Sequence, residues 1–417
     1  MVNICRIELF YTLVILFGSI TFGHVMAYFS PAERGIKVDL DLNETLLTVF
    51  NTLASIGAIF GGSLMNIFVT KFGRKYPLFV TAIISFISWL CLAITRKSFY
   101  WLAFIARCIC GVAIGAFSQV CPMYITELAP DELRGAFGAM NQLGVTTGSC
   151  LTYMWGIFFE WRTIAYISLI PSGLLIILIW FVKESPVYER QKNQYNDLEN
   201  NKSESLFQRK FILPLLTSFL LMFFQQFSGC NALLSNLETI FKDSGSSISP
   251  KVASFLVGLA GFVSTAISTF LVEKLGRKPS WLLSSASQCV LLILAAVNQK
   301  LQLSAVIPVI CLFLNNFAFG LGLGPIPWFY IPEFFPDSVR SLVCSIMTAV
   351  NWIFVSIVMF AWPSMRDSMG YFGAFLFYAA ILLASSLFAI FMLKETKGTK
   401  MGGEIDVSMI EDNDHTN

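Results

Sequence analysis

Polar side chains interrupt an otherwise apolar run in the middle of this sequence. The run reads LMFFQQFSGCNALL from Leu221 to Leu234, and it contains Gln225, Gln226 and Asn231. Burying an amide without a hydrogen-bonding partner costs about 2–7 kcal/mol. These side chains must therefore bond either to neighbouring helices, in a structural role, or to a bound ligand that supplies donors and acceptors.

Charged side chains form a second group, and their spacing is repeated. Glu127 precedes Arg134 by seven residues, and Glu333 precedes Arg340 by the same interval. Opposite charges at a repeated spacing can form ion pairs between helices. The alternative is that the basic residues only mark one side of a membrane, but it leaves the acids unexplained. Further charged residues accompany each repeat: Arg74, Glu184, Arg277 and Glu395.

The composition is that of a protein embedded in lipid. Hydrophobic residues make up 56% of the chain and charged residues 13%, against about 25% charged in an average soluble domain. A helix needs about 20 apolar residues to cross a bilayer, and we count twelve such stretches. The sequence therefore predicts an all-α membrane protein with 12 transmembrane helices in contact with the lipid bilayer.

The distribution of basic residues predicts the orientation of these helices. Connections on the side of the two termini carry about twice as many Lys and Arg residues as those on the other side. Because cytoplasmic connections are enriched in these residues, both termini are expected in the cytoplasm. The net charge of +2 is too small to indicate a nucleic-acid partner.

Several classes of function have no support in the sequence. All ten cysteines except Cys5 fall within predicted spans, and none has the spacing of a zinc site or a disulfide framework. We find no nucleotide-binding loop and no nucleophile–base pair. The protein is therefore predicted not to be an enzyme and to need no metal or cofactor.

The chain contains an internal repeat. FGRK and LGRK lie 203 residues apart, YITELAPDELRG and YIPEFFPDSVRS lie 206 apart, and KES and KET lie 211 apart. Because each landmark follows a predicted span, in the same order, we expect two six-helix halves with the same orientation. Secondary transporters use this plan around a substrate site at the midplane. The expected divisions are residues 1–182 and 212–393 for the halves, 183–211 for a cytoplasmic linker and 394–417 for a cytoplasmic tail.

Together these motifs resemble those of the sugar porter family of the major facilitator superfamily. The resemblance covers about residues 8–400 and rests on QQFSGCNA, GPIPWFYIPEFFP, PMYITELAPDELRG, NQLG, the GRK turns, ESP and ETKG. Within the family, the sequence is most similar to insect-type facilitated trehalose transporters. The resemblance implies the major facilitator fold in two pseudo-symmetric halves. It also implies facilitative transport of a small neutral sugar, such as glucose or trehalose, by a monomer at the plasma membrane.

The resemblance further implies which residues bind the sugar. Each sugar hydroxyl is both a donor and an acceptor, and side-chain amides offer both functions. Tryptophans supply flat apolar faces for the C–H surface of the ring. The implied sugar-binding residues are Gln142, Gln225, Gln226, Asn231, Trp328, Asn351 and Trp352. Breaks at Gly229 and between Gly320 and Pro327 are expected to bend the helices that line the site.

The charged repeats are implied to form a cytoplasmic gate. Glu127 would pair with Arg340 across or beside the seam between the halves, and Glu333 would pair with Arg134 in the same way. Such pairs would lock the outward-open state and part as the inside opens. The implied gating residues are Arg74, Arg107, Glu127, Arg134, Glu184, Arg277, Glu333, Arg340 and Glu395.

Arg107 lies within a predicted span, where a charge is costly. Proton-coupled sugar porters pair the corresponding Arg with an Asp in the first span, but Val25 stands at that position here. His24 is the one titratable alternative, since Glu160 and Glu238 at the outer ends of spans are expected to be hydrated and ionised. We therefore expect a uniporter.

The sequence departs from the family pattern at several positions. Gly320 replaces an acid of several glucose carriers and is expected to leave room for a larger sugar. The other departures are Thr70, Lys183, Lys394, Ser235 and Asn236, of which the last two fall at the outer gate. These departures keep two alternatives open: a proton-coupled sugar symporter, and a sugar sensor without transport on the same scaffold.

Overall fold

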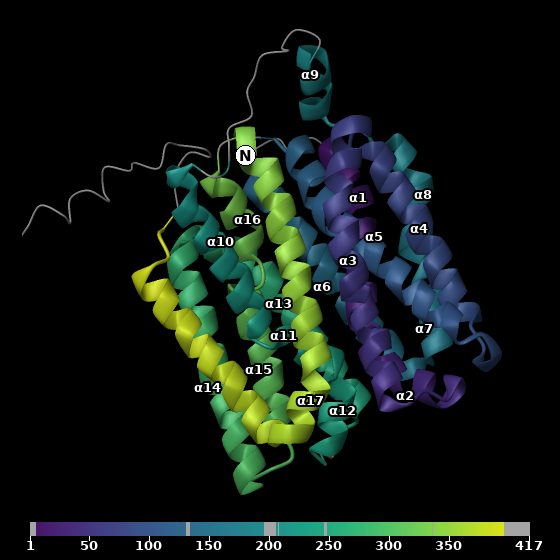
Figure 1. Ribbon diagram of the computed structural model, residues 1–417, viewed down its shortest axis with the longest axis vertical. Helices are drawn as coiled ribbons and strands as arrows, with labels where there is room; N and C mark the ends of the chain where they lie inside the picture. The colour runs from purple at the N-terminus through teal and green to yellow at the C-terminus, as the bar shows by residue number, and fades with distance from the viewer. Residues whose placement is uncertain are drawn as a thin grey trace, which may run out of the picture.

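The computed structural model is a bundle of long helices in two groups, one from each half of the chain (Figure 1). It describes residues 6–130, 134–195, 206, 208–245, 248–335 and 337–395. Every regular element in these ranges is a helix. The first half comprises α1 (Arg6–Ala27), α2 (Phe29–Leu40), α3 (Glu44–Phe72), α4 (Lys75–Ile94), the 3₁₀ helix η1 (Lys97–Phe99), α5 (Trp101–Leu128), α6 (Arg134–Phe158), α7 (Trp161–Ile167), α8 (Leu169–Leu178) and the 3₁₀ helix η3 (Ile179–Phe181). After α9 (Pro186–Tyr195), the second half comprises α10 (Arg209–Phe227), α11 (Cys230–Ser235), α12 (Leu237–Asp243), α13 (Pro250–Leu275), α14 (Arg277–Leu301), α15 (Ile307–Leu321), α16 (Ile326–Phe334) and α17 (Asp337–Phe391).

The helices are long enough to cross a bilayer. In the described part of the chain, ten segments have both the length and the hydropathy of a membrane span. The segment Leu342–Phe391 has 50 residues and is interrupted at Gly370, whose φ of 65° and ψ of 177° are not helical, so it can cross twice. α6 adds a less apolar helix of 25 residues. The prediction of an all-α membrane protein is therefore confirmed.

The two ends of the bundle carry different connections. The start of α1 and helix α9 lie at one end, which we call the α9 end, whereas α2 and α12 lie at the opposite end, the α12 end (Figure 1). α9 belongs to the predicted linker. Residues 196–205 of that linker and residues 396–417 of the predicted tail lie outside the described residues.

Each half has a hydrophobic core of its own. Trp89 and Trp161 are buried in the first half, and Trp281 and Tyr378 are buried in the second. The halves meet along a seam where α17 packs against α3 and α13 packs against α6. Trp352 of α17 crosses this seam, since it packs within a core cluster of the first half. Side chains at the seam are thus buried by both halves together.

Candidate functional site

Two helices of the second half are broken where the sequence predicts it. Gly229 separates α10 from α11 and has a φ of +80°, which glycine adopts without the steric cost of a side chain. Residues 322–325 separate α15 from α16. The predicted breaks are therefore confirmed, and each one leaves backbone carbonyl groups in need of donors.

Gln225 connects the two broken helices. Its amide nitrogen donates to the carbonyl oxygens of Leu323 at 3.1 Å and Gly324 at 2.7 Å. Its amide oxygen accepts from Gln226 Nε2 at 3.1 Å and from Asn351 Nδ2 at 2.8 Å. Four bonds occupy both N–H groups and both lone pairs of this side chain. Gln225 is therefore a link between helices, and in this structure its hydrogen-bonding capacity is filled.

Three other amides extend from this link and keep unused polar groups. Asn231 Nδ2 donates to Gln226 Oε1, so a chain of amides runs from Asn231 through Gln226 and Gln225 to Asn351. Gln226 and Asn351 are 5% and 2% exposed. The side-chain oxygens of Asn231 and Asn351 accept no hydrogen bond from the described residues. This amide chain can therefore bind a neutral ligand that both donates and accepts.

The remaining predicted binding residues lie on separate elements. The Trp352 indole nitrogen lies 3.3 Å from Ser118 Oγ across the seam, and the ring centroid lies 5.6 Å from that of Phe22. Nothing in the spacing of the sequence marked Phe22 or Ser118. Trp328 is half-buried against a core cluster of the second half. Gln142 of α6 is half-buried, and the structure does not bring it into hydrogen-bonding contact with the amide chain.

The expectation that Gly320 leaves room for a larger ligand is wrong. A Cβ at this position would lie 2.0 Å from Ser264 Oγ and 3.3 Å from the backbone nitrogen of Thr265. Both residues belong to α13. The glycine lets α15 approach α13, so the space that an acidic side chain would occupy is filled by the neighbouring helix.

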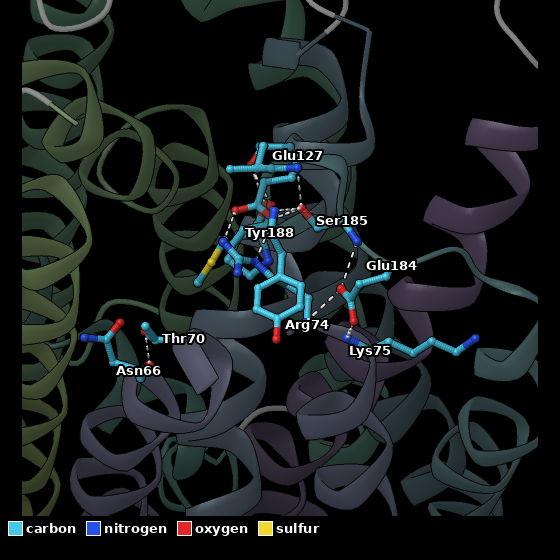
Figure 2. Close-up of polar contacts among 12 residues, drawn as sticks. Asn66, Thr70, Arg74, Lys75, Glu127, Glu184, Ser185 and Tyr188 are labelled. Atoms are coloured by element: carbon cyan, nitrogen blue, oxygen red, sulfur yellow. Dashed lines mark hydrogen bonds and ion pairs between the residues drawn. The ribbon is translucent and has the colours of Figure 1, made fainter. Parts of the chain in front are cut away.

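Charged residues of the first half form a compact cluster at the α9 end (Figure 2). Arg74 Nε and Nη2 each lie 2.8 Å from a carboxylate oxygen of Glu127. The Ser185 hydroxyl donates to the same carboxylate. The side chains of Arg74 and Glu127 are 6% and 13% exposed. Because the pair is shielded from water, loss of either partner would leave an unpaired buried charge.

A carboxylate that follows the last span of each half binds the start of a helix in that half. Glu184 accepts hydrogen bonds from the backbone nitrogens at the start of α4, at 2.9 and 3.2 Å. Glu395 accepts from the backbone nitrogens of Arg277 at 2.9 Å and Lys278 at 3.0 Å, at the start of α14. A carboxylate at a helix N-terminus satisfies free N–H groups and complements the helix dipole. The internal repeat therefore preserves a contact as well as a sequence pattern.

The other predicted gating residues are described less completely. Arg340 Nε donates to the carbonyl oxygen of Phe335 at 3.1 Å. The side chains of Arg134 and Glu333 lie outside the described residues. The two ion pairs predicted across the seam therefore stay predictions. Glu127 itself is bonded to Arg74 in its own half and to Ser185 at the start of the predicted linker.

The turn before α4 and the turn before α14 each contain a glycine that the backbone conformation requires. Gly73 has a φ of 83° and a ψ of −165°, and Gly276 has a φ of 98° and a ψ of 171°. Only glycine adopts this region readily. A Cβ at either position would also lie 2.4 Å from a carboxylate oxygen, of Glu184 in the first half and of Glu395 in the second.

Gly73→Ala is therefore expected to lower the stability of the protein by about 1–3 kcal/mol, the cost of this strained backbone region. Thermal unfolding of the purified protein in detergent would measure the loss. Gly173→Ala is the matched control, since its Cβ would be in ordinary contact, 3.4 Å from Phe86, within helix α8. Equal stability of the two variants would contradict the role assigned to Gly73.

Both halves of the chain match one family model. The model described as "Sugar (and other) transporter" matches residues 11–204 and 189–403. The chain belongs to the sugar transporter family. The predicted family is thus confirmed, and so is the prediction of a transporter rather than an enzyme.

Individual relatives agree with this assignment. The transporter is 32% identical to sugar transporter ERD6-like 18 of Arabidopsis thaliana, over 99% of this chain and 94% of that protein. It is 29% identical to the facilitated trehalose transporter Tret1 of Bombyx mori, over 92% of this chain and 83% of that protein. Among solved structures, the proton:xylose symporter XylE bound to 6-bromo-6-deoxy-D-glucose has a TM-score of 0.81 at 23% identity, covering 95% of this chain and 98% of that chain. This likeness confirms the major facilitator fold.

Arg107 of this sugar transporter is buried among aromatic rings. Its Nη1 donates to the backbone carbonyl oxygen of Val25 at 2.9 Å. Its guanidinium carbon lies 5.8 Å from the ring centroid of Tyr28 and 5.6 Å from that of Phe50, within the range of cation–π attraction. In the described part of the chain Arg107 has no acidic partner. His24, on the same helix as Val25, is 2% exposed.

The α12 end of the transporter is closed across the seam. The hydrogen bonds that join the halves there run from the Tyr153 hydroxyl to the Leu234 carbonyl at 2.9 Å, from Glu238 N to Ser30 Oγ at 3.3 Å, and from the Thr239 hydroxyl to Glu33 at 2.6 Å. Glu238 is half-buried rather than hydrated as expected, and burial at this seam raises its pKa to about 7. Glu160 is exposed as expected. Ser235 and Asn236 are both buried.

Proposed function

We propose that this transporter carries a small neutral sugar, such as glucose or trehalose, down its concentration gradient. The observation that supports this most is the amide chain at the two helix breaks, because its free oxygens and N–H groups suit hydroxyls. Gln226, Asn231 and Asn351 would contact the sugar, and Gln225 would fix their positions. Gln142 would complete the site from the first half.

We infer that the two halves rock about this site to expose it to each side in turn. Opening the α12 end would break the hydrogen bonds that cross the seam there. At the opposite end, the shielded pair of Arg74 and Glu127 would hold α5 against the turn before α4. The preference of basic residues for the cytoplasmic side supports a cytoplasmic α9 end. Both termini would then lie on the cytoplasmic side of a plasma membrane.

Uniport is favoured over proton symport by the surroundings of Arg107. A symporter needs a group that takes up a proton in one state and releases it in another. Val25 offers Arg107 a backbone carbonyl, which does not titrate, in place of the acid of proton-coupled relatives. Symport is the second candidate, since the fold is shared with a proton:xylose symporter. A sensor without transport is the third.

Uptake of labelled glucose and trehalose into proteoliposomes tests this proposal. We expect the sugar to equilibrate at equal concentrations, with no accumulation in an imposed pH gradient, and we expect uptake to survive His24→Ala. Protein-free liposomes give the background. Severalfold accumulation driven by the pH gradient would contradict uniport, and its loss in His24→Ala would identify the coupling residue. Sugar binding without counterflow would favour the sensor.

A further inference from the structure

Two glutamates from opposite halves lie on α2 and α12, which are joined across the α12 end of the seam. Glu33 of α2 accepts a hydrogen bond from the Thr239 hydroxyl of α12 at 2.6 Å. Glu238, one residue earlier in α12, bonds through its backbone nitrogen to Ser30 Oγ of α2 at 3.3 Å. Both glutamates are half-buried. Because each sits on a different half, the water that surrounds them changes whenever this end opens or closes.

The cations near these two acids are mostly engaged elsewhere. Lys37 forms an ion pair with Glu44, and Arg366 forms one with Asp367 at 2.9 Å. Lys251 of α13 is the cation that acts on Glu238. The groups that face Glu33 from α2, α3, α12 and α17 are Lys37, Glu44, Thr239, Arg366 and Tyr371, and the Tyr371 hydroxyl donates to Asp243. When the seam is closed, the cations near Glu33 are therefore already paired with other acids. Glu238 faces Lys251 of α13 and the Tyr153 hydroxyl of α6, and Lys251 opposes the effect of burial without cancelling it.

The balance of these effects favours the protonated acids. Burial raises the pKa of Glu238 to about 7, while Lys251 lowers it and the charge of Glu33 raises it. Burial also raises the pKa of Glu33, against the opposing effects of the Thr239 hydrogen bond and the nearby cations. In water, a glutamate has a pKa of about 4.3. Closing the seam thus moves the pKa of Glu238 toward neutral pH.

We propose that Glu33 and Glu238 form a proton-binding site that fills as the α12 end closes and empties as it opens. The site rests on the proposed alternating access. The proton comes from water on the side of the α12 end and returns to that side, so each cycle moves no net proton across the membrane. The site is therefore a gate that senses pH, and it is distinct from a coupling site.

The direction of the pH dependence follows from linkage. Because the pKa of Glu238 is higher in the closed state than in the hydrated open state, acidification favours closure between about 7 and the ordinary value of about 4.3. Above the closed-state pKa, closure must bury a charge and is disfavoured. One proton changes the ratio of closed to open molecules by at most about tenfold per pH unit.

Accessibility of a cysteine at the seam tests the proposal without any sugar. Asn236 is buried and lines a cavity of about 50 Å³ between α2, α3 and α17, so Asn236→Cys would react with a membrane-impermeant maleimide chiefly when the α12 end is open. Labelling of the protein without the added cysteine measures the background from its native cysteines. Ser304→Cys, at an exposed position after α14, corrects for the effect of pH on the thiol itself.

We expect the corrected labelling rate of Asn236→Cys to fall severalfold between pH 8 and pH 6. Adding Glu238→Gln, which mimics the protonated acid, should make labelling slow at both pH values, and Glu33→Gln should weaken the pH response. Glu160→Gln is the matched control, since this acid is exposed near the start of α7, and it should keep the full response. Size-exclusion chromatography would show whether each variant is folded.

Labelling that does not change with pH, or a full response in both Glu238→Gln and Glu33→Gln, would overturn the proton site. Failure of sugar uptake would contradict the proposed function, but the labelling rates of Asn236→Cys would still test the proton site. Accumulation of sugar that is driven by a pH gradient and lost in Glu238→Gln would overturn the proposed gate, because Glu238 would then be a coupling site. The same result would contradict uniport.

Discussion

Arg74→Glu should abolish transport while sugar binding remains measurable. The substitution removes the bidentate partner of Glu127 and places a carboxylate against both Glu127 and the nearby Glu184. Breaking a shielded ion pair by removing one partner costs about 3–5 kcal/mol, which corresponds to a factor of about 100 or more. The initial rate of uptake into proteoliposomes and equilibrium binding of labelled sugar would measure the two quantities separately.

Charge alone does not explain this expected loss. Lys71→Glu changes the same charge on an exposed residue just before the same turn and should leave transport nearly normal, because exposed charges contribute little. Combining Arg74→Glu with Glu127→Arg should restore part of the rate. If Arg74→Glu prevents insertion of the protein into the membrane, the cluster serves biogenesis rather than gating. Normal uptake would exclude both roles.

The charged residues at the α9 end could be identified from the sequence because the repeat contains them twice, but their partners could not. The GRK turns, Glu184 and Glu395 recur in one order, and the structure gives the two carboxylates the same backbone partners in their halves. Repeated sequence constrains local structure most where the contact lies within one half. The pairing of Glu127 with Arg74, by contrast, depends on how α5 meets the turn before α4, which the repeat does not specify.

The role of Gln225 could not be read from the sequence. Its donors bind backbone carbonyl oxygens of Leu323 and Gly324, and every residue type presents the same carbonyl group. A pattern of side chains therefore identifies a polar site without distinguishing an amide that binds a ligand from one that satisfies a helix break. The sequence predicted the breaks themselves, because glycine and proline mark them directly.

The errors at Gly320 and Glu238 have a common physical cause. The expectation for each residue came from the sequence of its own helix, whereas the side chain's surroundings are formed by a different helix. α13 fills the space beside Gly320, and α2 of the first half covers Glu238. Contacts between elements distant in the chain depend on helix tilt and, at the seam, on the state of the transporter. The spacing of residues in the sequence reveals neither the helix tilt nor the state of the transporter.

Gln226→Ala and Asn351→Ala should each weaken sugar affinity by about 1–3 kcal/mol, the usual effect of a lost or stranded hydrogen bond. That corresponds to a rise in Kd of about 5- to 150-fold. Both side chains are buried at the helix breaks and are joined to Gln225. Equilibrium binding of labelled glucose and trehalose to the purified protein would give Kd, and thermal unfolding of the same samples would give Tm.

Gln225→Leu separates support of the site from contact with the sugar. Removal of this amide leaves the carbonyls of Leu323 and Gly324 without their donor, and an unsatisfied buried polar group costs about 1–3 kcal/mol. We therefore expect Gln225→Leu to lower Tm clearly, with Kd rising only as the neighbouring amides lose their positions. Gln288→Ala is the matched control, because Gln288 is a buried amide of α14 bonded to Ser284, and it should change Tm alone.

Normal affinity in both Gln226→Ala and Asn351→Ala would place the sugar elsewhere. A large loss of affinity in Gln225→Leu at unchanged Tm would make Gln225 a ligand contact, which requires that sugar displace one of its four present partners.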